Sequence, residues 1–379
     1  MISRRQFILG ISGAVYFAGL SELSANLIQK NGKFVVILLK GGMDGLSAVP
    51  PLGDNSLYDR RRDLVTSSPR ILDGFYGLHP CLSNFWNLYQ KNEAAIIHAT
   101  NFPHINRSHF DCQNIIQTGF LRPYSAQTGW LGRIVRHLEM DSESMSLRLP
   151  LILRGSPMPK TFFPTNFKVI DDSVTKRSLD MLSDAHNGDV SAAFRSLNAR
   201  KHGDLREFSR DPIHLARYVA KRFSEPNGPS VAVLELGQFD THAEQGAESG
   251  KLYDQLRTLD DIFLTLRNGL NSCWANTTIV TLTEFGRTVE PNGSGGTDHG
   301  YGTVGFLAGG TLRGSNVLSD WPGLEKQSLF DGRDLKATID FRSVLSACLE
   351  KSFGIGHEEI AHIAFGNQKL ERITSQIFA

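Results

Sequence analysis

The sequence lacks an excess of charge of either sign. Its 379 residues contain 40 Lys plus Arg against 39 Asp plus Glu. Proteins that bind nucleic acid or an acidic membrane through charge usually carry a clear basic patch or excess. The basic clusters here are short, such as Arg60-Arg61-Arg62, and indicate solvated surface. Nucleic acid is therefore not an expected partner.

Cysteine is scarce as well. The four cysteines lie at positions 81, 112, 273 and 348. None of these spacings has the close pairing of a zinc ribbon or a redox motif, and none requires a disulfide, even outside the cytoplasm. Cys348 falls in an apolar helical pattern, which predicts a buried thiol.

Long hydrophobic runs are also absent. The apolar stretch from Phe7 to Leu20 is interrupted by glycine and serine, and it is shorter than the run of about 20 apolar residues that a spanning helix needs. Arg4 and Arg5 precede it in the pattern of a twin-arginine signal. We therefore expect residues 1–25 to be a signal peptide cleaved near Ala25, the twin-arginine translocase to be a partner during export, and the mature chain to reach the periplasm without a stable membrane span. The alternative is an uncleaved N-terminal membrane anchor.

Apolar runs alternate with helical patterns over the rest of the chain. Residues 34–39 form a continuous apolar run, typical of a parallel strand buried on both faces. Further strands are predicted at 94–99, 149–153, 231–236, 278–282 and 304–308. Apolar spacings of three and four predict helices at about 252–270 and 340–353.

This alternation predicts one α/β domain over residues 26–379. We expect a doubly wound, mostly parallel central sheet with helices on both faces. Residues 155–230 are less regular and are expected to form an insertion or cap. In such sheets ligands bind at the carboxyl ends of the strands.

Acidic and histidine side chains follow several of the predicted strands. They are Asp44, Asp240, His242, Glu284, Asp298 and His299. Carboxylates suit hard cations, and Asp with His is a usual ligand pair for zinc. Because loops after parallel strands gather at one sheet edge, we expect these six residues to form a metal site. For Asp44 taken alone, a glycine turn with an aspartate helix cap is the better explanation.

The segment Asn106-Arg107-Ser108-His109-Phe110-Asp111 precedes a helical stretch. Ser108 and Asp111 have the spacing of a capping box, which is a sufficient structural explanation. The functional alternative makes Ser108 a nucleophile, activated by the helix dipole and a neighbouring metal, with Arg107 holding the developing oxyanion. Arg287, which follows the strand at 278–282, is a weaker candidate for substrate contact.

These segments resemble the bacterial family called domain of unknown function 1501. The likeness rests on FVVILLKGGMDGLS at 34–47, RSHFDCQ at 107–113, FDTHAEQ at 239–245, TEFGRTVEPNGSGGTDHGYG at 283–302 and GRDLKATIDFR at 332–342. It covers nearly the whole mature chain in the family's order. The family is assigned to the alkaline phosphatase and sulfatase superfamily, so the resemblance implies an alkaline phosphatase-like fold.

The superfamily pattern also implies roles for single residues. Asp44 looks like the first acidic ligand and Ser108 like the nucleophile. Asp240 with His242, and His299 with Asp298, look like later metal ligands. Glu284 takes the place of an Asp-His dipeptide whose histidine is replaced by Phe285.

The missing histidine implies a site that differs from the usual two-zinc centre. One metal, or a set of oxygen ligands, would move the preference from zinc toward calcium, magnesium or manganese. We therefore expect an exported, metal-dependent hydrolase of phosphate or sulfate esters, acting on a small-molecule or polymer substrate through a serine or a metal-bound water. The alternatives are a non-catalytic periplasmic binding protein with a decayed hydrolase site, and a phosphotransferase.

Overall fold

The computed structural model describes residues 13–20, 31–144, 150–156, 211–226 and 228–378. Its strands are β1 (Gly13–Leu20), β2 (Lys33–Leu39), β3 (Arg70–Ile71), β4 (Gly77–Leu78), β5 (Ala94–Asn101), β6 (Met140–Ser144), β7 (Val231–Leu236), β8 (Thr277–Thr283), β9 (Thr303–Ala308), β10 (Val317–Leu318) and β11 (Ile339–Asp340). Its α-helices are α2 (Gly45–Ala48), α3 (Ser56–Arg61), α4 (Ser83–Gln90), α5 (His109–Thr118), α6 (Trp130–His137), α9 (Pro212–Phe223), α10 (Lys251–Gly269), α11 (Phe341–Phe353), α12 (His357–Phe365) and α13 (Thr374–Ile377). Short 3-10 helices lie at Arg62–Leu64, Leu151–Leu153, Trp274–Asn276 and Lys326–Ser328.

The central sheet has nine strands, in the order β10-β5-β9-β8-β2-β7-β1-β6, with β11 also paired to β5. Strand β2 pairs in parallel with both β7 and β8. Strand β9 runs antiparallel to β8 and β5, and β1 runs antiparallel to β7 and β6. Among the described strands of this sheet, β9 and β1 are thus the ones that oppose β2, so the sheet is mostly parallel, as predicted.

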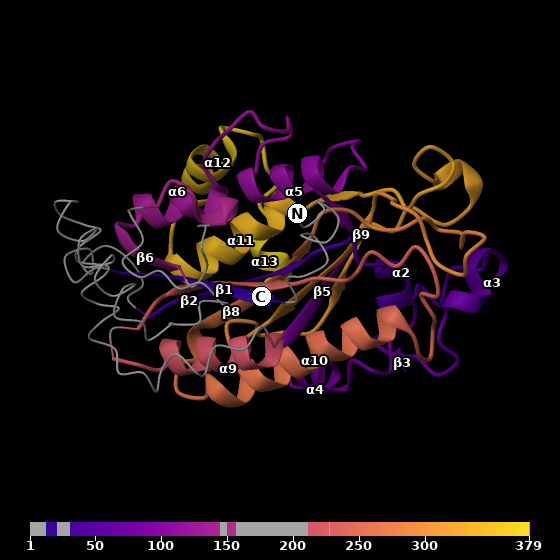
Figure 1. Ribbon diagram of the computed structural model, residues 1–379, viewed down its shortest axis with the longest axis horizontal. Coiled ribbons are helices and arrows are strands. Elements are labelled where there is room, and N and C mark those ends of the chain that lie inside the picture. The colour runs from indigo at the N-terminus through magenta and orange to yellow at the C-terminus, as the bar shows by residue number, and fades with distance from the viewer. Residues whose placement is uncertain (1–12, 21–30, 145–149, 157–210, 227, 379) are drawn as a thin grey trace, which may run out of the picture.

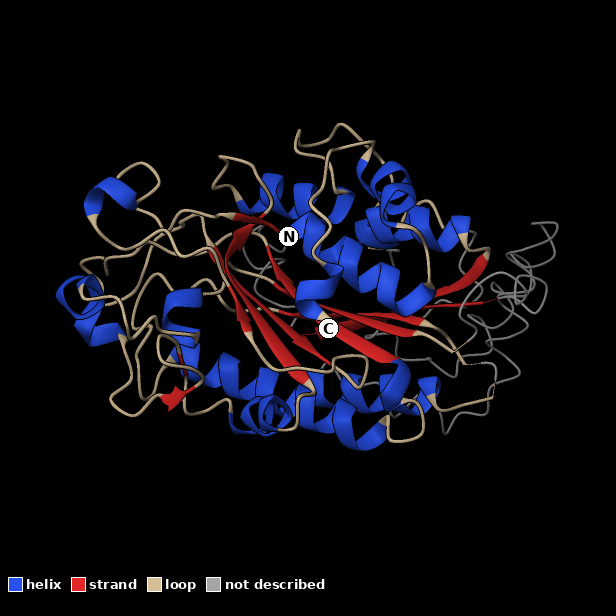
Figure 2. Cartoon of the chain, turned by 180° about the vertical axis from the view of Figure 1, so that it is seen from behind, coloured by secondary structure: helices blue, strands red, loops and turns tan. Residues whose placement is uncertain are grey.

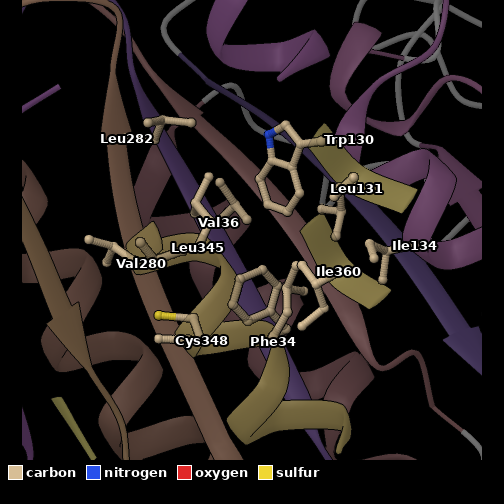
Figure 3. Close-up of a cluster of buried hydrophobic side chains, with 14 of the residues drawn as sticks. Phe34, Val36, Trp130, Leu131, Ile134, Val280, Leu282, Leu345, Cys348 and Ile360 are labelled. Atoms are coloured by element: carbon tan, nitrogen blue, oxygen red, sulfur yellow. The ribbon is translucent and has the colours of Figure 1, made fainter. Parts of the chain in front are cut away.

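Helices cover both faces of the sheet. Helices α5, α6, α11, α12 and α13 lie on one face, and α4, α9 and α10 lie on the other (Figure 1). Each layer has its own apolar core. On the first face, Phe34 of β2 lies beside Trp130 (Figure 3), with their rings edge-on at 6.5 Å. The Phe34 ring also meets that of Phe353 edge-on, at 6.2 Å. Burial of each such side chain stabilises the fold by roughly 1.5–3 kcal/mol.

The predicted strands at 34–39, 94–99, 231–236, 278–282 and 304–308 are confirmed as β2, β5, β7, β8 and β9, and both predicted helices are confirmed as α10 and α11. Apolar, β-rich runs identified these strands, and the run at 34–39 is continuous because both faces of the sheet are covered. The strand predicted at 149–153 is wrong: its described part is a 3-10 helix at Leu151–Leu153, whose Ile152 and Leu153 are buried.

Two predicted regions fall partly outside the described residues. Residues 157–210 of the predicted cap lie outside them, whereas α9, at its end, packs against α10 in the helix layer. Residues 13–20 of the predicted signal form β1, paired between β7 and β6. The export signal stays a prediction. Among the described residues, no helix combines the length and apolar character needed to span a membrane.

Candidate metal centre

Long loops gather at one end of the sheet (Figure 2). The loops after β5, β7 and β8 start at the carboxyl ends of these strands, and all three strands point the same way. Strand β9 runs the opposite way, so the loop that enters it from 284–302 lies at the same edge. Ligands from loops far apart in the sequence meet there, as expected for an α/β sheet.

Three side chains at this edge form a group suited to one metal ion. His109 begins α5, Asp240 lies in the loop after β7, and His299 lies just before β9. One ligand atom from each lies within 4.8 Å of the others. His109 Nε2 is 3.4 Å from Asp240 Oδ2, and His299 Nε2 is 3.3 Å from Asp240 Oδ1.

His242 lies beside this group. Its Nε2 is 3.1 Å from Asp240 Oδ1 and 3.0 Å from His299 Nε2. Three imidazole nitrogens therefore surround one carboxylate. Two ring nitrogens at this separation repel each other through their lone pairs unless a proton or a cation lies between them.

Each of the three histidines is oriented through its other ring nitrogen. His109 Nδ1 donates to Glu284 Oε1 at 2.8 Å, and His242 Nδ1 donates to Asp298 Oδ1 at 3.0 Å. His299 Nδ1 donates to the backbone carbonyl of Arg107 at 2.8 Å. Because Nδ1 carries the proton in these bonds, the lone pair of Nε2 is left for a metal. This arrangement is typical of metal-binding histidines.

The spacing of these atoms fits zinc. A tetrahedral zinc ion with ligand distances of about 2.0–2.1 Å separates its ligand atoms by about 3.3–3.4 Å. Within the group, Asp240 Oδ2 lies 3.4 Å from His109 Nε2 and Asp240 Oδ1 lies 3.3 Å from His299 Nε2. In addition, His109 Nε2 is buried and makes no hydrogen bond, with Asp240 Oδ2 lying 3.4 Å away, although a buried polar atom normally has a partner. A cation bound to it would remove this deficit.

The charges around Asp240 keep its carboxylate ionised. Burial raises the pKa of Asp240. Hydrogen bonds from His109, His299 and Arg287 lower this pKa by more than burial raises it, so that it lies well below its usual range. Burial lowers the pKa of His109, whereas the Asp240 and Glu284 carboxylates raise it more, to about 9. Without a metal the His109 ring is therefore protonated at neutral pH, and a bound cation would replace that proton.

Phe285 forms the apolar floor of the site. Its ring is fully buried and lies 4.9 Å from the His109 ring and 4.6 Å from the His299 ring. Gly42, at a φ of +74°, leaves room for it, because a Cβ there would lie 2.4 Å from Phe285 Cε2. Phe285 thus forms a rigid wall behind these two histidines.

The structure corrects the place of Asp44. Its carboxylate is 1% exposed and accepts hydrogen bonds from Leu46 N, Ser47 N and Ser47 Oγ. Arg61 and Gln245 donate to its Oδ2. Asp44 therefore caps α2 and neutralises the buried Arg61, and no metal-ligand group among the described residues contains it.

Glu284 and Asp298 lie behind histidines, whereas both were predicted as ligands. Glu284 is fully buried, and its Oε1 accepts from Gly41 N, His109 Nδ1 and Gln113 Nε2. Asp298 Oδ1 accepts from His242 Nδ1 and Asn292 Nδ2. Their carboxylates orient histidines instead of lying with the ligand atoms.

Arg287 is placed beneath the site, which does not fit the predicted substrate contact. Its side chain is buried, and it donates to the carbonyl oxygens of Gly41, Gly42, Phe239 and Thr297. It also donates to Asp240 Oδ1 at 2.6 Å. Arg287 therefore fixes the backbone around Asp240.

Ser108 and Arg107 border the site. Ser108 is the N-cap of α5, but its side chain makes no capping hydrogen bond, so the capping-box prediction is wrong and the hydroxyl is left available. The guanidinium of Arg107 donates to Asp334 and Asp331. Contact of Arg107 with a substrate anion would require exchange of the exposed Asp331.

His109 is the one residue of the site that sequence reasoning missed. It stands next to Ser108 in a segment already singled out, and its position as the first residue of α5 was the available signal. The helix start aims its ring across the sheet edge toward Asp240.

Comparison with known proteins identifies a matching family model. The model of a family described as protein of unknown function (DUF1501) matches residues 182–363. The expected likeness is confirmed over this stretch, which contains Asp240, His242 and His299 but not His109. No curated protein matches the chain.

Two solved structures resemble the chain distantly. The structure of Ps i-CgsB in complex with k-i-k-neocarrahexaose has a TM-score of 0.42 at 11% identity, covering 91% of this chain and 76% of that chain. The C-terminal periplasmic domain of EcEptC from Escherichia coli, in complex with Zn, has a TM-score of 0.35 at 11% identity, covering 77% of this chain and 75% of that chain. Both scores are too low for an inference about function.

Proposed function

We propose that the protein is a zinc-dependent hydrolase of phosphate or sulfate esters. The observation that carries this proposal is the convergence of three histidine Nε2 atoms on the Asp240 carboxylate, each ring being held through Nδ1. A set of three nitrogens and one carboxylate suits zinc better than calcium or magnesium, which prefer oxygen ligands.

His109, Asp240 and His299 would hold the metal, with His242 beside Asp240 and His299 as a further group. When bound, zinc supplies a Lewis acid that polarises an ester oxygen and lowers the pKa of a neighbouring hydroxyl or water. Ser108 follows as the nucleophile, because its hydroxyl makes no capping bond and lies at the N-terminus of α5. The helix dipole stabilises negative charge at that position. Phe285 shields the inner side of the site from water.

We also propose that the fold is related to that of alkaline phosphatase and that the protein is exported. An alkaline phosphatase-like architecture is supported by the mostly parallel sheet between two helix layers and by the ligands at its carboxyl edge. Export through the twin-arginine route is supported by Arg4 and Arg5 ahead of a moderately apolar stretch. That route carries folded proteins, which suits a metal bound before export.

The test measures zinc content and ester turnover together. Wild-type protein is loaded with zinc, freed of excess metal and analysed by mass spectrometry, then assayed on p-nitrophenyl phosphate and p-nitrophenyl sulfate. We expect about one zinc ion per chain, with hydrolysis of one of the esters. His109→Gln and Asp240→Asn are each expected to lose both the metal and the turnover.

His137→Gln serves as the matched control. His137 lies on α6 and contacts Glu359 at 2.9 Å, so its loss leaves the site intact. Zinc bound with no hydrolysis of either ester would favour a metal-dependent binding protein over an enzyme. A wild-type protein that takes up no zinc, manganese or calcium would refute the metal site itself.

A further inference from the structure

Gln245 lies at the centre of a buried hydrogen-bond network beneath the candidate metal centre. Its side chain is fully buried. Its Oε1 accepts from Thr241 Oγ1 at 2.8 Å and from Thr297 Oγ1 at 2.6 Å. Its Nε2 donates to Asp44 Oδ2 at 2.6 Å and lies 3.4 Å from Ser47 Oγ. Both lone pairs and both protons of the amide therefore have partners.

The two threonines belong to the two loops that carry the ligands. Thr241 stands between Asp240 and His242, and Thr297 stands two residues before His299. Backbone bonds already join these loops, from Thr297 N to Thr241 O at 3.1 Å and from Gln245 N to Gly295 O at 3.0 Å. The Gln245 amide adds a side-chain tie between the same loops.

The amide also has only one orientation that satisfies its neighbours. The Asp44 carboxylate accepts hydrogen bonds, so Nε2 must face it, and Oε1 must then face the threonines. Asp44 is in turn fixed by the buried Arg61. The ion pair therefore sets the position of Gln245, which sets the spacing of the two loops.

We propose that Gln245 is a positioning residue for the metal ligands, which couples the loops of Asp240 and His299 to the buried Asp44–Arg61 ion pair. This inference rests on the proposed metal site. Gln245 touches neither metal nor substrate, so it acts through the geometry of the loops. Groups that orient metal ligands typically change metal affinity by about 10–100-fold when they are removed.

The test replaces Gln245 with methionine, which has a similar length and makes none of these bonds. Two properties are measured. One is the zinc dissociation constant, by chelator competition. The other is amide hydrogen exchange in the metal-free protein at Thr297 and at Glu244, whose N–H donates to Ser294 O across the same two loops at 3.1 Å. We expect the zinc dissociation constant to rise by about tenfold and the two amides to exchange faster. The milder Thr297→Val variant, which removes one of the ties, is expected to shift both in the same direction.

Thr278→Val is the matched control for the loss of buried hydrogen bonds. Thr278 lies at the opposite end of β8, where its Oγ1 bonds to Thr311 and Ser352. This variant is expected to be less stable to urea but to keep wild-type zinc affinity and wild-type exchange at Thr297.

The outcomes separate this inference from the proposed function. Wild-type zinc affinity and unchanged exchange in Gln245→Met would overturn the positioning role while the metal site stands. If the wild-type chain takes up no zinc, the proposed function fails, and the exchange rates of the metal-free protein still decide whether Gln245 fixes the loops. A zinc loss of the same size in Thr278→Val would also overturn the inference, because it would mark a general effect of stability.

Discussion

The Asp44→Asn variant tests whether Asp44 stabilises the fold or binds the metal. The order of the sequence motifs predicts a metal ligand, whereas the structure pairs the carboxylate with Arg61. Both side chains are almost completely buried, with 1% and 0% of their surface exposed. Asparagine keeps the size of the side chain and an oxygen for the α2 cap, but it removes the countercharge of Arg61.

The expected loss of stability follows from these contacts. Breaking a buried ion pair by removing one partner typically costs about 3–5 kcal/mol, because the other charge stays buried. In the variant the new Nδ2 group would also face two donors, Arg61 and Gln245 Nε2, which now bond to Oδ2. We therefore expect the free energy of unfolding to fall by about 3–5 kcal/mol. Asp44→Asn combined with Arg61→Met is expected to recover part of this loss.

The assay is urea unfolding of the metal-free protein, followed by zinc content at saturating metal. Asp44→Asn is expected to bind as many zinc ions as the wild type, with affinity lowered at most through Gln245. A variant that stays within about 1 kcal/mol of wild-type stability but loses its zinc would refute this reasoning. A change of that size in the free energy of unfolding is typical of substitutions at exposed positions, not of a broken buried ion pair. Asp44 would then be the ligand that the motif order implies.

Two further predictions concern the loss of stability in acid through His98 and the replacement of the buried Arg287. His98 is fully buried, and burial lowers its pKa to about 4 from an unfolded value near 6.5. As the pH falls, the unfolded chain therefore binds a proton at His98 before the folded chain does. The contribution of His98 to the free energy of unfolding is complete above pH 6.5 and falls by about 3 kcal/mol between pH 6.5 and pH 4. Urea titrations across this range should show a smaller fall in His98→Gln, and an unchanged slope would contradict the assignment. Arg287→Lys is expected to lower the free energy of unfolding of the metal-free protein by about 2–5 kcal/mol, because lysine cannot replace the fork of buried donors. An effect confined to KM, with stability unchanged, would instead favour the predicted substrate contact.

Much of the fold could be predicted from local sequence. The run that became β2 is continuous and apolar because helices cover both faces of the sheet, and the repeat of α10 follows from its single buried face. The segment at 149–153 shows the limit of this reasoning. Ile152 and Leu153 are buried as an apolar run predicts, but a 3-10 turn buries them as well as a strand does. Periodicity cannot separate the two structures over so few residues.

The site divides in the same way. The sequence by itself placed Asp240, His242 and His299 on loops at one sheet edge, because strand direction determines where those loops emerge. Only the tertiary structure decided which oxygen or nitrogen faces the centre. His109 belongs to the ligand group because the start of α5 points its ring at Asp240. Glu284 does not belong to it because its carboxylate accepts the hydrogen bond that orients that ring. Asp44 pairs with Arg61, 17 positions away in the sequence, and not with the metal ligands. No local sequence pattern predicts that ion pair. Residue type and strand order determine which groups reach an edge, whereas hydrogen bonding between distant segments determines what each group does there.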